Sequence, residues 1–296
     1  MESTRDIKGR IKSVTNIQQI TKAMKMVAAA RLRKAEEKAS GARPYADKVE
    51  ELLRRASSAA PGYTHPLLAE RPVKVTGYLV ICGDKGLAGA YNSNVMKQTV
   101  AEIAGKDPAT YRLYVCGKQA RNYLRFRGYR MDSYHFGFSD KPSADDSIAL
   151  AEEVIDLFDK GEIDEVKIIY TKFFTALRQQ VTVTRLLPIE APEAGEAAEG
   201  AQDGSPYAKG EVPYIFLPGA AAVLDNLLPQ YVQVQIYSAM LQSAASELGS
   251  RMAAMSAATD NATERIADLN LTYNKARQAQ VTNEISEIVG GANALE

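Results

Sequence analysis

The sequence predicts a mixed fold, in which an α/β domain is inserted into a long antiparallel coiled coil formed by the N- and C-terminal helices. Two observations predict the coiled coil: helix-breaking residues are missing at both ends of the chain, and apolar residues recur there at heptad spacing. A third observation, short apolar runs that alternate with helical segments in the middle, predicts the inserted domain. The expected boundaries are residues 1–60, 61–220 and 221–296.

Both ends of the chain lack the residues that interrupt helices. Residues 10–40 contain no glycine or proline, and residues 230–289 contain only Gly249. Since glycine and proline are the strongest helix breakers, each end is expected to form one long helix. At 1.5 Å per residue the second helix would extend roughly 90 Å if unbroken. Gly41 to Pro44 is expected to end or bend the first helix, before a second helical stretch from Tyr45 to Ala60.

Each terminal segment carries a seam, by which we mean a row of mostly apolar residues at heptad spacing that would face a partner helix. In the C-terminal segment its members lie alternately four and three residues apart: Leu241, Ala245, Leu248, Met252, Met255, Thr259, Ala262, Ile266, Leu269, Tyr273 and Ala276. In the N-terminal segment the seam repeats every seven residues with two added positions: Ile7, Val14, Thr21 and Ala28, with Ile17 and Met24. Two amphipathic helices packed on an ordinary domain would show the same periodicity. The expected length of the two terminal helices favours the coiled coil, because it far exceeds the average helix length of about 11–12 residues.

The middle of the chain reads as a Rossmann-like α/β unit with a largely parallel sheet. Strands are expected at Val73–Cys82, Tyr111–Val115, Val166–Tyr170 and Gln180–Leu186, with a further candidate at Tyr129–Phe136. Helices are expected at Ser93–Ala104, Lys118–Phe126 and Ser143–Lys160. The last of them opens on Ser143 with Asp146 three residues later, which predicts a capping box. Residues 188–213 are rich in Glu, Ala, Gly and Pro, and are expected to form a mobile acidic loop.

Composition indicates a soluble protein, because 46% of the 296 residues are hydrophobic and 24% are charged. No apolar run is long enough to span a bilayer, and the N-terminal residues resemble neither a secretory signal nor a transit peptide. Cys82 and Cys116 are expected to be reduced thiols in the core. His65 and His135 are too few and too far apart to suggest a metal site, so neither a metal nor a cofactor is expected.

The N-terminal helix is strongly basic. Eight Lys or Arg residues and no Asp or Glu lie between Ile7 and Ala35. Such a helix could contact nucleic acid, an anionic membrane surface or an acidic protein surface, or could simply present a solvated face. Nucleic acid is disfavoured because Gln18 and Gln19 alone supply base-reading side chains. An acidic protein partner therefore remains the main functional alternative to a solvated face.

A glycine-rich loop, residues 83–92, follows the first expected strand and leads into a helix. Phosphates often bind at such a turn, because free backbone N–H groups and the helix dipole converge there. The glycines at positions 83, 86 and 89 do not fit G-x-G-x-x-G, and no G-K-[ST] ending is present. We therefore interpret the loop as a structural turn. Since no Ser/His/Asp or Cys/His set can be assembled either, the chain is not expected to be catalytic by itself.

Three segments together resemble the gamma subunit family of F-type ATP synthases. They are IKGRIKSVTNIQQITKAMKMVAAARLR from Ile7, ICGDKGLAGAYNSNV from Ile81, and RMAAMSAATDNA from Arg251, which continues through LNLTYNKARQAQVTNEISEIVGGA to Ala292. The resemblance covers the chain in order. It implies a central stalk (rotor) subunit of a proton-translocating complex, which transmits rotation of the c-ring to the catalytic alpha/beta hexamer for ATP synthesis.

The resemblance also implies partners and a location. The paired helices would lie inside three alpha and three beta subunits, and the α/β domain would contact the epsilon subunit and the c-ring, with no nucleic acid and no direct membrane span. The chloroplast redox cysteine pair is absent, which indicates the cytoplasmic face of a bacterial inner membrane. Two other interpretations remain: a stand-alone coiled-coil adaptor with a degenerate nucleotide-binding domain, and a nucleotide-dependent enzyme that uses Gly83 to Gly89.

Particular contact residues are implied by the matched motifs. The resemblance implies contacts with the hexamer for Met24, Lys25, Arg251, Gln278, Thr282, Glu284 and Glu287. It implies an apical tip, seated in an apolar sleeve, for Ile285, Ile288, Val289 and Leu295. Met24 also fits the seam of the first helix, so packing within the chain is the alternative for that residue.

Overall fold

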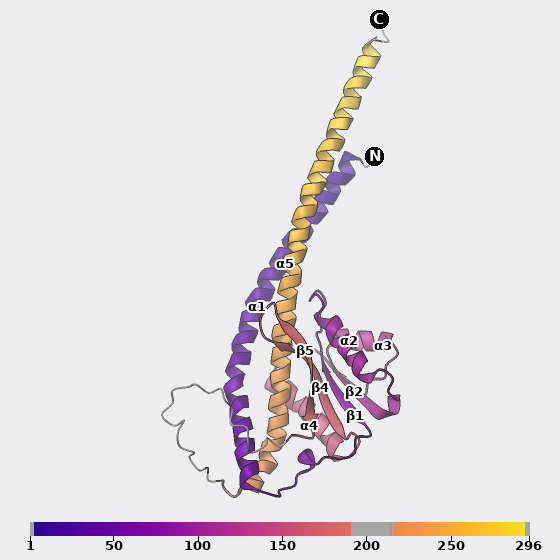
Figure 1. The fold of residues 1–296 in the computed structure, drawn as a ribbon. Coiled ribbons are helices and arrows are strands. Elements are labelled where there is room, and N and C mark those ends of the chain that lie inside the picture. Colours follow the sequence, from indigo (N-terminus) through magenta and orange to yellow (C-terminus); the bar gives the residue numbers. More distant parts are fainter. Residues whose placement is uncertain (1–2, 191–213, 215, 294–296) are drawn as a thin grey trace.

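Two long helices dominate the molecule. In the computed structural model, which describes residues 3–190, 214 and 216–293, helix α1 spans Thr4–Ala59 and helix α5 spans Ala220–Asn293. With 56 and 74 residues, they extend about 85 Å and 110 Å at 1.5 Å per residue. Figure 1 shows them running side by side in opposite directions, with the α/β domain beside their lower half and both chain ends at the upper end. The antiparallel coiled coil with an inserted domain is confirmed.

Helix α1 does not end between Gly41 and Pro44, which was one of the two outcomes expected there. It continues through Pro44, so the second helical stretch expected after that residue belongs to the same helix. A proline inside a helix costs about 3 kcal/mol. Beyond it, Val49, Leu53 and Ala56 are buried in a hydrophobic cluster that includes residues of α5 and of the α/β domain, and this packing offsets the cost. Helix α5 likewise includes Pro229 and begins at Ala220, next to the expected boundary at residue 221.

The inserted domain contains one five-stranded sheet in the order β3-β2-β1-β4-β5. Its strands are β1 (Thr76–Ile81), β2 (Tyr111–Cys116), β3 (Ser133–His135), β4 (Glu165–Phe173) and β5 (Gln179–Leu187). Strands β1 to β4 are parallel, and β5 returns antiparallel to β4 as a hairpin. The largely parallel sheet is confirmed, although β3 is shorter than its candidate run.

Helices cover both faces of the sheet. Helices α2 (Tyr91–Ile103) and α3 (Lys118–Phe126) pack on one face, and α4 (Ala144–Asp159) packs with α5 and the lower part of α1 on the other. Strand β1 alternates accordingly, with Tyr78 and Val80 in the first core and Leu79 and Ile81 in the second. The predicted capping box that begins α4 is present. Short 3-10 turns occur at Pro66–Leu68 and Pro108–Thr110.

The two cysteines lie in the two cores. Cys82 and Cys116 are both buried and unpaired, and they pack on opposite faces of the sheet. Burial raises the pKa of the Cys82 thiol to about 12, so this thiol stays protonated near neutral pH. The prediction of reduced core thiols is confirmed.

The seam between the long helices follows the predicted heptad spacing on α5. Its residues Leu241, Leu248, Met255, Ala262 and Leu269 are buried. On α1 the positions seven residues apart from Ile7 also turn inward, but the prediction for Ile17 is wrong, because 53% of that residue is exposed. The seam of α1 steps alternately by four and three residues, as on α5, which brings Ile11 and Gln18 toward α5 in its place.

Candidate functional site: the shaft and its junction with the domain

Helices α1 and α5 pair to form a shaft. Hydrogen bonds between the two helices stabilise its seam. Gln18 Nε2 donates to Thr263 Oγ1 at 2.7 Å, and Lys25 Nζ donates to Ser256 Oγ at 3.0 Å. Between them the hydroxyls of Thr21 and Thr259 lie 2.8 Å apart. Polar groups at seam positions fix the register of a coiled coil at some cost in stability. The heptad pattern alone did not predict these hydrogen bonds, although Gln18 and Lys25 fall four residues after the seam positions Val14 and Thr21.

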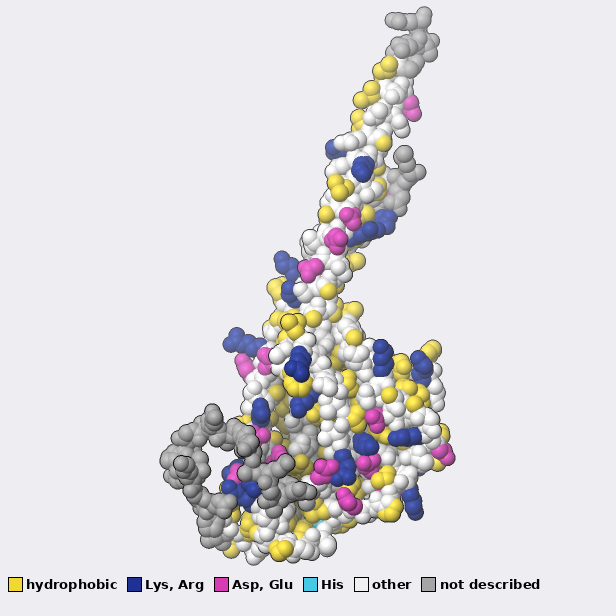
Figure 2. Space-filling view, viewed as in Figure 1, with side chains coloured by type: hydrophobic (Ala, Val, Ile, Leu, Met, Phe, Trp, Pro, Cys, Tyr) yellow, Lys and Arg dark blue, Asp and Glu magenta, His cyan; other side chains and the backbone are white. Residues whose placement is uncertain are grey.

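The shaft continues beyond α1 as a single helix. Thr4, at the start of α1, donates a hydrogen bond to Gln280 of α5 at 3.0 Å, and α5 runs on to Asn293. The predicted tip residues Ile285, Ile288 and Val289 are 56%, 72% and 52% exposed, and Figure 2 shows hydrophobic side chains along this end. Leu295 lies outside the described residues. Contiguous exposed apolar side chains mark a contact surface.

The other predicted contact residues divide into two groups. Gln278, Thr282, Glu284 and Glu287 are exposed on the upper part of α5. Met24 is half-buried beside the seam, and Lys25 is exposed although its ammonium contacts Ser256. The structure brings the first group together near the tip and places the second lower, where the two helices are paired.

The basic run of α1 is not alone on the shaft. Helix α5 exposes Asp260, Glu264 and Asp268 along the paired region. In Figure 2, Lys and Arg side chains alternate there with carboxylates. The surface of the upper shaft is therefore mixed in charge, and a partner packed around it would meet charges of both signs.

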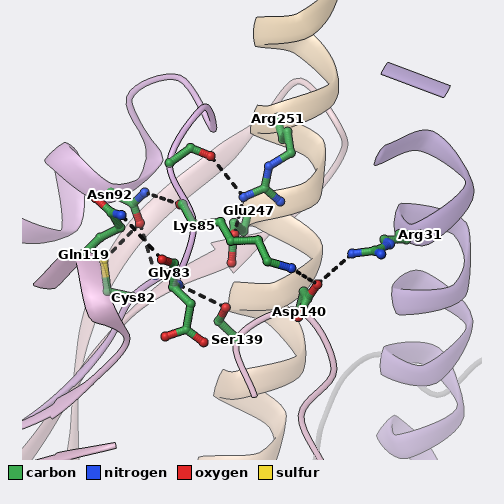
Figure 3. A network of polar contacts seen from close by, with 12 residues as sticks. Arg31, Cys82, Gly83, Lys85, Asn92, Gln119, Ser139, Asp140, Glu247 and Arg251 are labelled. Carbon is green, nitrogen blue, oxygen red and sulfur yellow. Dashed lines mark hydrogen bonds and ion pairs between the residues drawn. The ribbon is translucent and has the colours of Figure 1, made fainter. Parts of the chain in front are cut away.

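The glycine-rich loop is tied down by its own side chains (Figure 3). Asn92 accepts hydrogen bonds from the Gly83 N–H and the Cys82 thiol, both at 3.1 Å, and donates to the Lys85 carbonyl. The Asp84 carboxylate accepts from the Lys118 N–H at 3.0 Å and the Gly137 N–H at 2.8 Å. These bonds support the interpretation of the loop as a structural turn.

Helix α5 fills the place where a nucleotide would bind. In doubly wound sheets ligands occupy the crevice at the carboxyl ends of the strands where the strand order reverses, here between β1 and β4. Glu247 and Arg251 of α5 lie against this loop, only 1% and 8% exposed, and form an ion pair at 2.5 Å. A Cβ on Gly83 would lie 3.0 Å from the carboxyl carbon of Glu247. A buried carboxylate at this point is incompatible with a phosphate.

Arg251 therefore has contacts inside the chain. Besides the ion pair, its guanidinium donates to the Gly86 carbonyl at 3.4 Å. Burial raises the pKa of Glu247, and the hydrogen bond and charge of Arg251 act in the opposite direction. The contact of Arg251 with the hexamer stays a prediction, now for a side chain whose exposed part is small.

A second junction lies at the β4–β5 hairpin. Ser250 donates from Oγ to Gln179 Oε1 at 2.5 Å, and Gln179 Nε2 donates to the Ala176 carbonyl at 3.0 Å. A Cβ on Gly249 would lie 2.7 Å from that Gln179 nitrogen and 3.3 Å from the Ala176 oxygen. The single glycine in the middle of α5 thus permits close approach of the hairpin.

These features define a class of protein: a two-helix shaft with a polar seam, a projecting apolar tip, and an attached α/β domain whose nucleotide crevice is filled by the shaft itself. Within the described residues, none of the helices has a stretch apolar enough to cross a bilayer.

Comparisons with known proteins identify the family. A family model described as ATP synthase matches residues 3–295. ATP synthase gamma chains of Heliobacterium modesticaldum and Desulfitobacterium hafniense are 48% and 46% identical over 296 residues, covering 100% of each chain. The chain belongs to the ATP synthase gamma chain family.

Solved structures show the same fold. A chain of the Euglena gracilis mitochondrial ATP synthase aligns with a TM-score of 0.67 at 18% identity, over 99% of this chain and 94% of that one. A chain of the central stalk and c-ring of the Tetrahymena thermophila enzyme aligns with a TM-score of 0.61 at 22% identity, over 81% of this chain and 99% of that one.

Proposed function

We propose that this chain is the central stalk (rotor) subunit of a proton-translocating F-type ATP synthase, in which it transmits rotation of the c-ring to the catalytic alpha/beta hexamer for ATP synthesis. One observation carries the proposal: α5 extends past the start of α1 as an apolar-tipped single helix on a paired, register-locked shaft. Such a tip suits a bearing inside a ring of partners, because it exposes apolar area that a free protein would bury.

The partners correspond to the two halves of the molecule. The upper shaft lies within three alpha and three beta subunits, and the α/β domain contacts the epsilon subunit and the c-ring. The hexamer is contacted by the exposed part of Arg251 and by six further residues of the two helices: Met24, Lys25, Gln278, Thr282, Glu284 and Glu287. Bacterial relatives named ATP synthase gamma chain, matched over their full length, support the assignment of the chain to such a complex.

The chain itself carries out no chemistry in this proposal. The filled crevice supports that role, since Glu247 and Arg251 occupy the space beside Gly83 that a nucleotide phosphate would need. As a peripheral subunit bound to the membrane-embedded ring, the chain would lie on the cytoplasmic face of a bacterial inner membrane.

Co-expression of the tagged chain with its alpha and beta subunits, followed by native mass spectrometry, tests the proposal. One copy per three alpha and three beta subunits is the expected result. Ile288→Asp, which charges the tip, should reduce recovery of that assembly, whereas Asn94→Asp on exposed α2 adds the same charge away from the shaft and should not. Self-association of the chain without alpha and beta would favour the stand-alone adaptor instead.

A further inference from the structure

Asp140 joins the α/β domain to α1. It lies in the segment between β3 and α4, and its Oδ2 accepts hydrogen bonds from Lys85 Nζ at 2.8 Å and Arg31 Nη1 at 2.7 Å. Figure 3 shows the two cations reaching this carboxylate from opposite sides, with α5 nearby. Because Lys85 belongs to the glycine-rich loop and Arg31 to α1, one carboxylate links three separate parts of the chain.

The bridge is partly shielded from water. The Asp140 side chain is 18% exposed, whereas those of Lys85 and Arg31 are 58% and 46% exposed. The hydrogen bond from Lys85 and the charges of both cations hold the pKa of Asp140 below its usual value, so the carboxylate is ionised at neutral pH. The neighbouring Ser139 accepts a hydrogen bond from the Asp84 N–H at 3.1 Å, which ties the segment back to the same loop.

The two shaft helices are attached to the domain in different ways. Helix α5 is held against the loop by the buried Arg251, which donates to the Gly86 carbonyl, and against β4 by Ser246, which donates to the Thr171 carbonyl. At the level of the loop the side chain of Arg31 reaches the domain, and the neighbouring Leu32 and Ala35 of α1 lie in a small apolar cluster with α5 and the β4–β5 hairpin; the larger shared core begins lower, at Val49.

We infer that Asp140 is a positioning residue that fixes the angle of the α/β domain relative to α1, so that torque entering through the domain reaches both helices of the shaft. The inference rests on the proposed function as a rotor and deepens it. With the carboxylate removed, Lys85 and Arg31 would face each other as like charges, and the domain would gain angular freedom about α5.

Spin labels on α1 and α2 measure this freedom in the full chain. The two native cysteines are buried, so the exposed positions Ser40→Cys and Lys97→Cys take the labels. In Asp140→Asn the population of conformers in which the α/β domain has moved away from α1 should rise about five-fold, which is the effect of losing a partly exposed ion pair. The distribution of label distances should broaden accordingly.

Two further variants separate positioning from general loss of structure. Asp140→Glu keeps the charge and should restore most of the narrow distribution. Arg33→Gln removes one cation from the same helix, but Arg33 pairs with Glu37 on α1 itself, so the distribution should match the wild type. If Asp140→Asn fails to fold by circular dichroism, Arg31→Gln takes its place, because it breaks the α1 arm alone. Label distances in the Asp140→Asn or Arg31→Gln variant that superimpose on those of the wild type would overturn the inference.

The same variants then enter the assembled complex. With a probe on the α/β domain, the angular spread at each pause of ATP-driven rotation should widen in Asp140→Asn and not in Arg33→Gln. An unchanged spread would overturn the role in torque transfer. A wild-type chain that does not rotate in the assembly would contradict the proposed function instead, and the label distances would still decide whether Asp140 positions the domain.

Discussion

Replacing Gly249 with leucine should detach the β4–β5 hairpin from the shaft. A Cβ at this position lies 2.7 Å from Gln179 Nε2 and 3.3 Å from the Ala176 carbonyl oxygen. The Gln179 side chain would have to leave, which breaks its hydrogen bonds with Ser250 and Ala176. The remaining leucine atoms would then press on the hairpin backbone, which cannot rotate away as a side chain can.

The magnitude combines three terms. Replacing glycine inside a helix stabilises the helix by about 1 kcal/mol through helix propensity. Two lost hydrogen bonds cost about 1 kcal/mol each, and overpacking against the backbone costs about 1–3 kcal/mol. Gly249→Leu should therefore lower the free energy of unfolding by about 2–4 kcal/mol. Gly249→Ala, which adds the Cβ alone, should lower it by about 1 kcal/mol.

Urea unfolding of the full chain, followed by far-ultraviolet circular dichroism, measures both changes. Gly41 is the matched control, because it also lies within a long helix but a Cβ there would meet nothing within 4 Å. Gly41→Ala should raise the free energy of unfolding by about 1 kcal/mol. If Gly249→Ala stabilises the chain as much as Gly41→Ala does, the hairpin does not pack on α5 as described and the reasoning is refuted.

Three further predictions concern the shaft and the edge of the sheet. Ile266→Pro should cost about 3 kcal/mol or more in the paired part of α5 and abolish assembly with alpha and beta, as measured by co-purification. Ile7→Ala, at a seam residue that is 1% exposed, should cost about 2–4 kcal/mol and raise amide hydrogen exchange at the N-terminal end of α1. His135→Gln removes the 2.8 Å contact with Glu153 and should cost about 0.5–1 kcal/mol between roughly pH 5 and 6.5, as measured by urea unfolding across pH.

The pH window for His135 is set by two pKa shifts. Glu153 raises the pKa of His135, so the stabilisation is present below the unfolded value of 6.5 and is lost as the pH rises through the raised value. His135 in turn lowers the pKa of Glu153, so the stabilisation is lost as the pH falls through that lowered value. A cost that stays constant from pH 4 to pH 9 would contradict this pairing, and normal assembly of the Ile266→Pro variant would contradict the continuous shaft.

Local patterns predict most of the fold, because the long helices and the alternating strands carry their periodicity in consecutive residues. Pro44 is the exception in α1, since the helix continues past it because Val49 and Leu53 are buried in a cluster with α5 and the α/β domain, which are distant in the sequence. The prediction for Ile17 failed because a seven-residue repeat does not say which residue between two repeat positions faces the partner helix. Gln18, four residues after Val14, takes that position because it bonds to Thr263 on the distant helix.

The junction could be predicted only in part. The glycine spacing indicated a structural turn, but the residues that fill the crevice beside it lie on α5, far along the chain. Glu247 and Arg251 look like an ordinary helical i, i+4 pair in the sequence, and only the placement of α5 beside Gly83 buries them. Asp140 likewise carries no signal of its own, since both of its cations come from other segments.

The pairing of the two chain ends also determines when the long helices can pack together during synthesis of the chain. Thr4 and its partner Gln280 are separated by 276 residues, so at about 5–20 residues per second a ribosome needs roughly 14–55 s to supply the second after the first. During that interval α1 has no helix to pack against, and Ile7 and Leu32 face water. The small residues and dense positive charge of α1 limit self-association of the waiting helix. The face of the sheet that α5 covers also waits, because Leu228 and Ile236 of α5 belong to its core, so this face and the shaft are completed only after α5 has been made.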